Sequence, residues 1–151
     1  MPFAASPTAL PIRPLRVLVV EDDDDHAELT TVALQAHDAR HHILRARDGA
    51  EALDILFGRG EYAGTERPDL MLLDLNLPRV GGLEVLSAVK DDERLREVPV
   101  VVLTTSDAES DRVRAYRHHA NSYLIKPVDF GKFEAMIAEL GDYWARWNRL
   151  P

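Results

Sequence analysis

The strongest constraint on the fold is a regular alternation, between Leu15 and Trp147, of short apolar runs with stretches of helical spacing. The apolar runs are rich in Val, Ile and Leu, which is typical of buried strands, and they cover residues 15–20, 42–46, 70–73, 100–103 and 122–125. Apolar residues at helical spacing indicate helices over residues 25–36, 48–57, 83–89, 109–118 and 129–147. Strands that alternate with helices predict an α/β fold: a doubly wound five-stranded parallel sheet with helices on both faces.

The chain divides into a short first segment and one domain. Its 151 residues are typical of a single domain. Residues 1–14 contain four prolines and no periodic apolar pattern, so we expect a flexible N-terminal tail there. Residues 15–151 form the expected domain, which ends in an aromatic helix.

Composition excludes several classes of function. The net charge of −8 argues against binding to nucleic acid or to an anionic membrane, because both need basic patches. The chain has no Cys, so it has no disulfide, thiolate chemistry or Cys-based metal site. No apolar run approaches the length of a membrane span.

Polar residues follow the apolar strands at one predicted edge of the sheet. Glu21 and Asp22 follow the first strand, Asp74 the third, Thr104 the fourth and Lys126 the fifth. Right-handed crossovers place the carboxyl ends of all these strands at the same edge, where open α/β sheets bind their ligands.

This set of residues predicts phosphoryl transfer. Three converging carboxylates repel one another, and a divalent cation relieves that repulsion. Oxygen ligands without His or Cys favour Mg²⁺. Lys126 and the hydroxyl of Thr104 can then donate to the oxygens of a phosphoryl group, while a carboxylate accepts it.

The motifs, taken in order, resemble the response-regulator receiver domain of two-component signalling over residues 15–147. The matching pieces are Val-Val-Glu-Asp at 19–22, Leu-Asp-Leu-Asn-Leu-Pro at 73–78, Gly81-Gly82, Pro-Val-Val-Val-Leu-Thr at 99–104, and Tyr-Leu-Ile-Lys-Pro at 123–127. The resemblance implies a flavodoxin-like receiver fold and a cytoplasmic location. It also implies a phosphoacceptor that is not an enzyme and catalyses only its own Mg²⁺-dependent phosphorylation and dephosphorylation.

The same resemblance implies roles for single residues. Asp74 would accept a phosphoryl group from a phosphohistidine of a sensor histidine kinase, and it would share in binding Mg²⁺. Asp22 would bind the metal directly, Glu21 through water, and Asn76 through its backbone carbonyl. Glu21 departs from the commoner Asp at its position.

Three further residues would contact the phosphoryl group or respond to it. Thr104 and Lys126 would contact the phosphoryl oxygens. Tyr123 would turn inward when Thr104 moves toward the phosphate, which would alter a protein-interaction surface. A half-buried strand Tyr without any switching role remains the alternative.

Two features resemble the single-domain regulators that partner bacterial phytochromes. One is the long connection over residues 58–68, and the other is the aromatic end of the last helix. A bacteriophytochrome kinase is therefore the expected partner.

Two other functions compete with the phosphorylation switch. One is a phosphorylation-independent interaction module on a receiver fold. The other is a hydrolase with an Asp nucleophile, which usually needs a second carboxylate two residues later, where this chain has Asn76.

Other acidic and apolar residues are expected to have structural roles only. Asp23, Asp24 and Asp25 are expected to be a solvated acidic loop or, for Asp25, a helix cap. The apolar stripe of the last helix is expected to be core, and it comprises Phe130, Phe133, Met136, Ile137 and Leu140.

Three aromatic residues lie beyond that stripe, where less of the domain remains to cover them: Tyr143, Trp144 and Trp147. They predict a symmetric homodimer through the last helix, with folding back onto their own domain as the alternative.

Overall fold

The computed structural model describes residues 10–151, which form one five-stranded sheet. Every neighbouring pair of strands is parallel, and the spatial order is β2-β1-β3-β4-β5. The strands are β1 (Arg16–Val20), β2 (His42–Ala46), β3 (Leu70–Leu73), β4 (Val100–Thr104) and β5 (Ser122–Ile125). The predicted doubly wound parallel sheet is confirmed.

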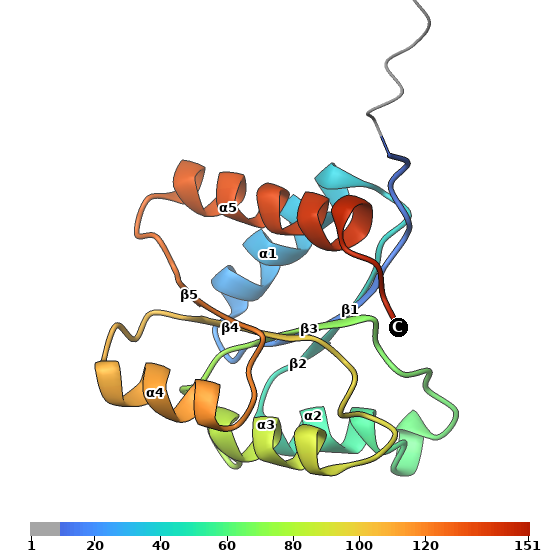
Figure 1. Cartoon of the computed structure of the whole chain (residues 1–151), viewed down its shortest axis with the longest axis vertical. Helices are drawn as coiled ribbons and strands as arrows, with labels where there is room; N and C mark the ends of the chain where they lie inside the picture. Colours follow the sequence, from blue (N-terminus) through green and yellow to red (C-terminus); the bar gives the residue numbers. More distant parts are fainter. Residues whose placement is uncertain (1–9) are drawn as a thin grey trace, which may run out of the picture.

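Helices cover both faces of the sheet (Figure 1). One face carries α1 (Asp24–His37) and α5 (Phe130–Asp142). The other carries α2 (Gly49–Leu56), α3 (Gly82–Asp91) and α4 (Glu109–Arg117), and a short 3₁₀ turn, η1 (Gly60–Tyr62), follows α2. This three-layer arrangement leaves the carboxyl ends of the strands free at one edge.

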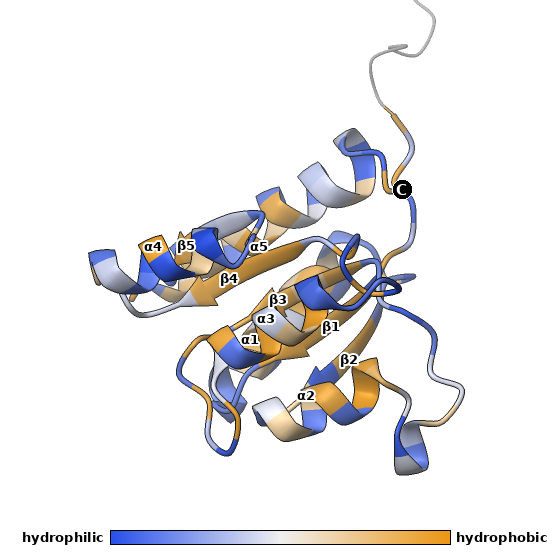
Figure 2. Cartoon of the chain, turned by 60° about the horizontal axis from the view of Figure 1, so that its bottom comes forward, coloured by the Kyte–Doolittle hydropathy of each residue, from blue (hydrophilic) through white to orange (hydrophobic). Residues whose placement is uncertain are grey.

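Alternate residues of each strand belong to two separate cores. Leu18 and Val20 pack with the α2–α3–α4 layer, whereas Val17 and Val19 pack with the α1–α5 layer. The central strands β1, β3 and β4 are therefore apolar over most of their length, as Figure 2 shows, whereas the edge strand β2 includes His42 and Arg45. Burial on both faces explains why their sequences read as continuous apolar runs.

The first turn of α1 corrects one expectation. The helix is capped by Asp23, whose side chain accepts a hydrogen bond from the backbone N–H of His26 (3.0 Å). Asp25, the predicted cap, lies inside the helix and is exposed. An N-cap carboxylate satisfies a backbone donor that has no partner within the helix, which fixes where α1 begins.

The last helix is not continuous to Trp147. Helix α5 ends at Asp142, and the π-helical turn η2 (Tyr143–Trp147) follows, closed by a hydrogen bond of 2.7 Å from Asn148 N–H to the carbonyl of Tyr143. Trp144 is buried, whereas Tyr143 and Trp147 are 53% and 55% exposed.

These observations correct two further expectations. Trp144 packs in the α1–α5 core, so it does not lie beyond the region that the domain covers. In the apolar stripe of α5, Phe133, Ile137 and Leu140 are buried and Met136 is partly buried, but Phe130 is 66% exposed. Phe130 is the first residue of the helix, next to the N-cap Asp129.

The segment before β1 lies against the end of the chain. Residues 10–14 form neither helix nor strand, but Arg13 donates to the carbonyls of Ala145 (2.9 Å) and Asn148 (2.7 Å). Residues 1–9 of the predicted flexible tail lie outside the described residues, so the boundary at residue 14 stays a prediction. No helix among residues 10–151 is long and apolar enough to cross a membrane.

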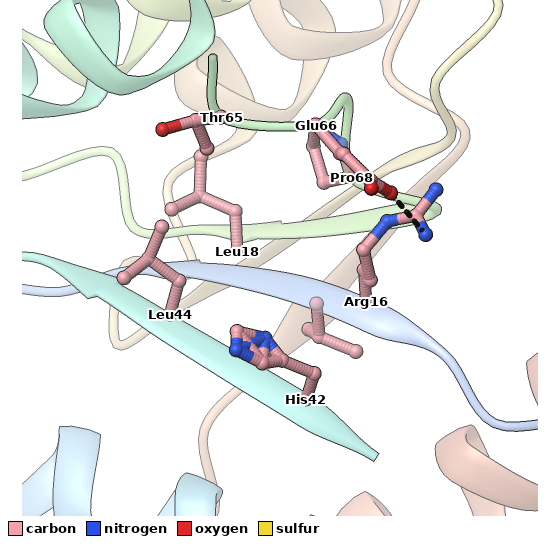
Figure 3. Close-up of a pocket in the computed structure, with 8 residues that line it drawn as sticks. Arg16, Leu18, His42, Leu44, Thr65, Glu66 and Pro68 are labelled. Carbon is pink, nitrogen blue, oxygen red and sulfur yellow. Dashed lines mark ion pairs between the residues drawn. The ribbon is translucent and has the colours of Figure 1, made fainter. Parts of the chain in front are cut away.

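A cavity of about 470 Å³ lies near the amino ends of β1 and β2, away from the edge where the strands end (Figure 3). Leu18 and Leu44 come from the strands, and Thr65 and Pro68 come from the long connection before β3. An ion pair between Arg16 and Glu66 (2.7 Å) lies beside it. This cavity is therefore separate from the predicted chemistry.

Candidate functional site

The sheet itself holds the polar residues in place. Their backbone N–H groups extend the parallel ladders by one residue: Glu21 donates to Ala46 (3.0 Å), Asp74 to Val20 (3.0 Å) and Lys126 to Thr104 (2.7 Å). Each side chain therefore starts from a fixed backbone position at the carboxyl edge. Such rigid support is what a site for group transfer needs.

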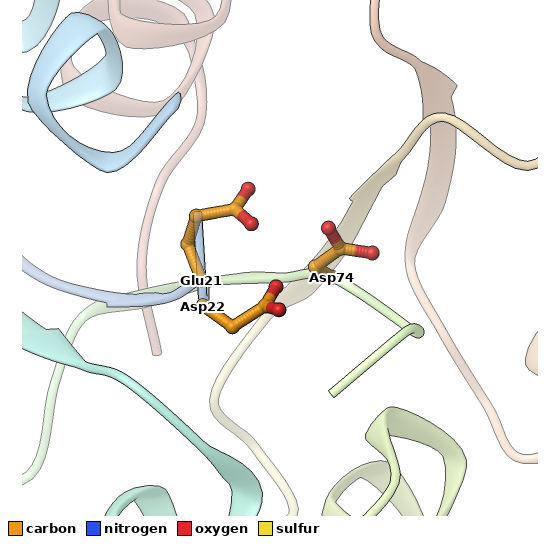
Figure 4. Close-up of side chains that lie close together, drawn as sticks. All are labelled: Glu21, Asp22 and Asp74. Atoms are coloured by element: carbon orange, nitrogen blue, oxygen red, sulfur yellow. The ribbon is translucent and has the colours of Figure 1, made fainter. Parts of the chain in front are cut away.

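Three carboxylates meet at this edge, as Figure 4 shows. One oxygen from each of Glu21, Asp22 and Asp74 lies within 4.8 Å of the others. Glu21 and Asp74 are buried, whereas Asp22 is exposed. An all-oxygen set with one side open to water fits a hard divalent cation that keeps part of its water shell.

The ammonium group of Lys126 lies between two of these carboxylates. Its Nζ atom donates to Asp74 Oδ2 (2.9 Å) and to Glu21, and it also lies 3.0 Å from Nδ1 of His26. The Lys126 side chain is only 3% exposed. A buried cation against buried carboxylates offsets part of their mutual repulsion, and it stays available to bind oxygens brought to Asp74.

The carboxyl group of Glu21 has a raised pKa. Burial raises the pKa of its carboxyl group to about 7; hydrogen bonding and charge from Lys126 oppose that rise, and the charge of Asp74 adds to it. Negative charge is therefore costly here, which again favours a cation beside the cluster.

Close packing shapes the turn after Asp74. The backbone N–H of Asn76 donates to Asp74 Oδ1 (3.1 Å), which orients that carboxylate. A Cβ atom on Gly82 would lie 2.4 Å from the backbone carbonyl oxygen of Asp74, so only glycine fits there. The Gly81-Gly82 pair of the sequence thus lets α3 start against the loop of Asp74.

Thr104 and Tyr123 converge on Ser106 in the β4–α4 loop. The buried Thr104 Oγ1 accepts from the backbone N–H of Ser106 (3.3 Å), and the Tyr123 hydroxyl donates to the Ser106 carbonyl (2.9 Å). Burial raises the pKa of the Tyr123 phenol. The side-chain hydrogen bond of Thr104 thus leads toward this loop, whereas the side chain of Lys126 contacts Asp74, Glu21 and His26.

Three residues at this edge were not predicted from the sequence. Ser106 links the two candidate switch residues, and its hydroxyl also donates to Asp111 (2.5 Å). Arg45 donates to the backbone carbonyls of Glu21 (3.0 Å) and Asp22 (3.3 Å). The third is His26. A charged residue inside strand β2 could have pointed to Arg45, but no pattern points to His26.

The chain belongs to the family of response regulator receiver domains, whose model matches residues 17–138. A probable methanogenesis regulatory protein, FilR2 of Methanothrix harundinacea, is 47% identical over 138 residues, which are 91% of this chain and 88% of that protein. The response regulator Rcp1 of Synechocystis is 38% identical and covers 91% of this chain and 94% of its own length.

Solved structures agree with this assignment. The phosphorylated cyanobacterial phytochrome response regulator RcpA has a TM-score of 0.89 and 38% identity, with 91% of this chain and 99% of that chain covered. The Mn²⁺-bound form of Rcp1 has a TM-score of 0.87 and 38% identity, with the same coverage. Bacteriophytochrome response regulators are also among the similar structures.

The family sets the general role of the chain. It is a response regulator receiver of two-component signalling, a pathway in which receiver domains interact with histidine kinases. Receiver domains bind a divalent metal, as the Mn²⁺-bound relative illustrates, and the acidic cluster here has the matching donor set.

Proposed function

We propose that Asp74 accepts a phosphoryl group from a phosphohistidine of a sensor histidine kinase, in a reaction that depends on Mg²⁺. The observation that carries the proposal is the contact of 2.9 Å between the Lys126 ammonium and Asp74 Oδ2, inside a cluster of three carboxylates. Only this part of the described chain joins a buried acceptor, a buried cation and additional acidic oxygens.

The chemistry assigned to Asp74 is substitution at phosphorus. One carboxylate oxygen forms the new O–P bond while the bond from the donor nitrogen to phosphorus breaks, which leaves an acyl phosphate. Lys126 donates to a phosphoryl oxygen, and Thr104 supplies a hydroxyl to another. No carboxylate stands at Asn76 to act as a general acid, which favours storage of the phosphoryl group over rapid hydrolysis.

Mg²⁺ is the proposed cation because the available donors are hard oxygens. Asp22 and Asp74 would bind it directly, Asn76 through its backbone carbonyl and Glu21 through water. When bound, the ion neutralises charge on the phosphoryl oxygens.

Phosphorylation is proposed to act outward through Thr104 and Tyr123. Both side chains bond to Ser106 at the start of the β4–α4 loop. A movement of Thr104 toward a phosphoryl oxygen would release its bond to Ser106 and alter the position of this loop, which lies next to α4. The surface of α4, β5 and α5 is therefore the proposed output.

The proposed kinase is a bacteriophytochrome. Support comes from the likeness to RcpA and to bacteriophytochrome regulators, together with the long connection before β3 and the aromatic η2 turn. FilR2 is named for methanogenesis and not for light sensing, so the relatives share the family but not the stimulus. A cytoplasmic location, a homodimer and no contact with nucleic acid or membrane belong to the same proposal.

Labelling with a small phosphodonor tests the acceptor. Incubation with acetyl phosphate and Mg²⁺ should add one phosphoryl group, which mass spectrometry of the intact protein detects. Asp74→Asn should abolish the added mass, since an amide oxygen is a poor nucleophile. Asp25→Asn is the matched control, because it removes an exposed carboxylate in the nearby first turn of α1.

Undiminished labelling of Asp74→Asn would reject Asp74 as the acceptor. No labelling of the wild-type protein by acetyl phosphate or by purified sensor kinases would leave the phosphorylation-independent interaction module in its place.

A further inference from the structure

His26 completes the set of acceptors around the ammonium of Lys126. The ammonium group has three N–H donors, and three acceptors surround it: Asp74 Oδ2, Glu21 and His26 Nδ1. Because an ammonium cannot accept a hydrogen bond, Nδ1 of His26 must present its lone pair. The imidazole therefore carries its proton on Nε2 when this contact is made.

Two independent contacts fix the imidazole ring. The backbone N–H of His26 donates to the N-cap residue Asp23 (3.0 Å), which sets the start of the side chain at the first turn of α1. The ring stacks on the buried Phe133 of α5, with centroids 6.3 Å apart and an angle of 26° between the planes. Its place beside Lys126 is thus built from two helices that pack together on one face of the sheet.

The ring also forms part of the wall around Lys126. A cavity of about 310 Å³ opens beside the site, and His26 and Lys126 line it together with Leu29, Phe130 and Phe133. The His26 side chain is 32% exposed, whereas that of Lys126 is 3% exposed. His26 therefore stands between solvent and the buried ammonium.

The contribution of His26 to the position of the Lys126 ammonium follows from what its removal would leave. Glu21 and Asp74 hold the ammonium through carboxylate oxygens, and His26 supplies the third acceptor from α1. If His26 is replaced by an apolar side chain, one buried N–H loses its partner, and Nζ is free to shift between the two carboxylates. A donor that must meet a phosphoryl oxygen works best when it is held in place before the reaction.

We infer that His26 is a positioning residue for phosphoryl transfer, which holds Lys126 in the orientation that donates toward Asp74. This inference rests on the proposed function of Asp74 and Lys126. It adds a residue to which the motifs assign no role, and it links the α1–α5 layer directly to the site.

Two substitutions separate hydrogen bonding from packing. His26→Asn keeps an acceptor, because its amide oxygen occupies nearly the position of Nδ1. His26→Leu keeps similar bulk without an acceptor. We expect the rate of Asp74 phosphorylation by acetyl phosphate at saturating Mg²⁺ to fall about tenfold in His26→Leu and to stay near the wild-type rate in His26→Asn. Mg²⁺ affinity should be the same in all three proteins.

A spectroscopic measurement keeps the inference testable if His26→Leu fails to fold. In ¹⁵N-histidine-labelled wild-type protein, His26 should show an unprotonated Nδ1 and a protonated Nε2, and Lys126→Met should shift the Nδ1 resonance. A proton on Nδ1, a wild-type rate in His26→Leu, or equal losses in the Leu and Asn variants would overturn the positioning role.

Failure of this inference is distinct from failure of the proposed function. If Asp74→Asn abolishes labelling and both His26 variants react at the wild-type rate, only the role of His26 is lost. If Asp74→Asn is still labelled, the acceptor is wrong, and the tautomer of His26 then reports only on its contact with Lys126.

Discussion

Individual carboxylates at the carboxyl edge differ in their surroundings. Glu21 and Asp74 are buried and contact Lys126, whereas Asp22 is exposed and has no described side-chain hydrogen bond. Because Asp22 is exposed and its side chain makes no described ion pair, a cation can bind it without breaking a contact of the folded domain. The removal of its carboxylate should therefore affect metal binding more than folding.

Asp22→Ala should weaken Mg²⁺ binding at least about tenfold, the lower end of the loss seen when even outer partners of a metal are removed. Phosphorylation by acetyl phosphate should slow in parallel, and EDTA should stop it in the wild-type protein. Titration of the metal by calorimetry, with Asp25→Ala as the matched exposed control, measures the effect. Equal phosphorylation in EDTA and in Mg²⁺ would show that the metal site is misassigned.

Among the elements, the β4–α4 loop joins the site to the rest of the structure. Ser106 accepts from Tyr123 and donates to Thr104 and Asp111, so the loop is held by side chains from β4, β5 and α4. This short segment gives a change at Thr104 a direct route to α4. The loop is thus the natural two-state element of the fold.

A phosphate mimic such as beryllofluoride should shift amide resonances of Ser106, Tyr123 and the first turn of α4. Tyr123→Phe removes a hydrogen bond of roughly 1 kcal/mol and should reduce the shifts in α4 while it leaves the mimic bound at Asp74. Tyr116→Phe is the control, because Tyr116 lies exposed on α4 and makes no described hydrogen bond. Changes confined to residues around Asp74 would contradict the coupling.

The end of the last helix carries both a buried and an exposed aromatic surface. Trp144 follows Ile137 and Leu140 at helical spacing, so it lies on the buried face and packs in the α1–α5 core. Tyr143 and Trp147 are left exposed, and Tyr143 packs edge-on against Trp144 (5.2 Å between ring centroids). An interface at this end must therefore centre on Tyr143 and Trp147.

For the whole molecule, we expect a symmetric homodimer through α5 and η2, because two exposed aromatic residues lie together at one end of the chain. Trp147→Ala should weaken the dimer about thirtyfold, as expected for an aromatic anchor worth about 2 kcal/mol. Sedimentation velocity over a range of protein concentrations, with and without beryllofluoride, measures the dissociation constant.

Trp144→Ala is unsuitable for that test, since it would empty part of the core and destabilise the fold by roughly 3–5 kcal/mol. Tyr116→Ala is a better control, because it removes an exposed aromatic residue from α4 in the opposite layer. A wild-type protein that stays monomeric at micromolar concentrations in both states would exclude the dimer.

Most of the architecture follows from local patterns in the sequence. A strand that is buried on both faces consists largely of apolar residues, so Leu70–Leu73 is recognisable as a strand. The structure gives β2, β3 and β5 the predicted bounds. The parallel arrangement then brings Glu21, Asp22, Asp74, Thr104 and Lys126 to one edge, because each follows or ends a strand. Their roles in phosphoryl transfer stay predictions until they are measured.

Contacts between elements follow only from the packing of the folded chain. His26 reaches Lys126, and Arg45 holds the carbonyls of Glu21 and Asp22, because segments far apart in the sequence pack together. Periodicity records which face of an element is apolar, but a single polar contact between distant segments leaves no periodic trace. Local patterns in the sequence therefore predict the fold of this receiver domain. The finer structure of its site depends on contacts that exist only in the folded chain.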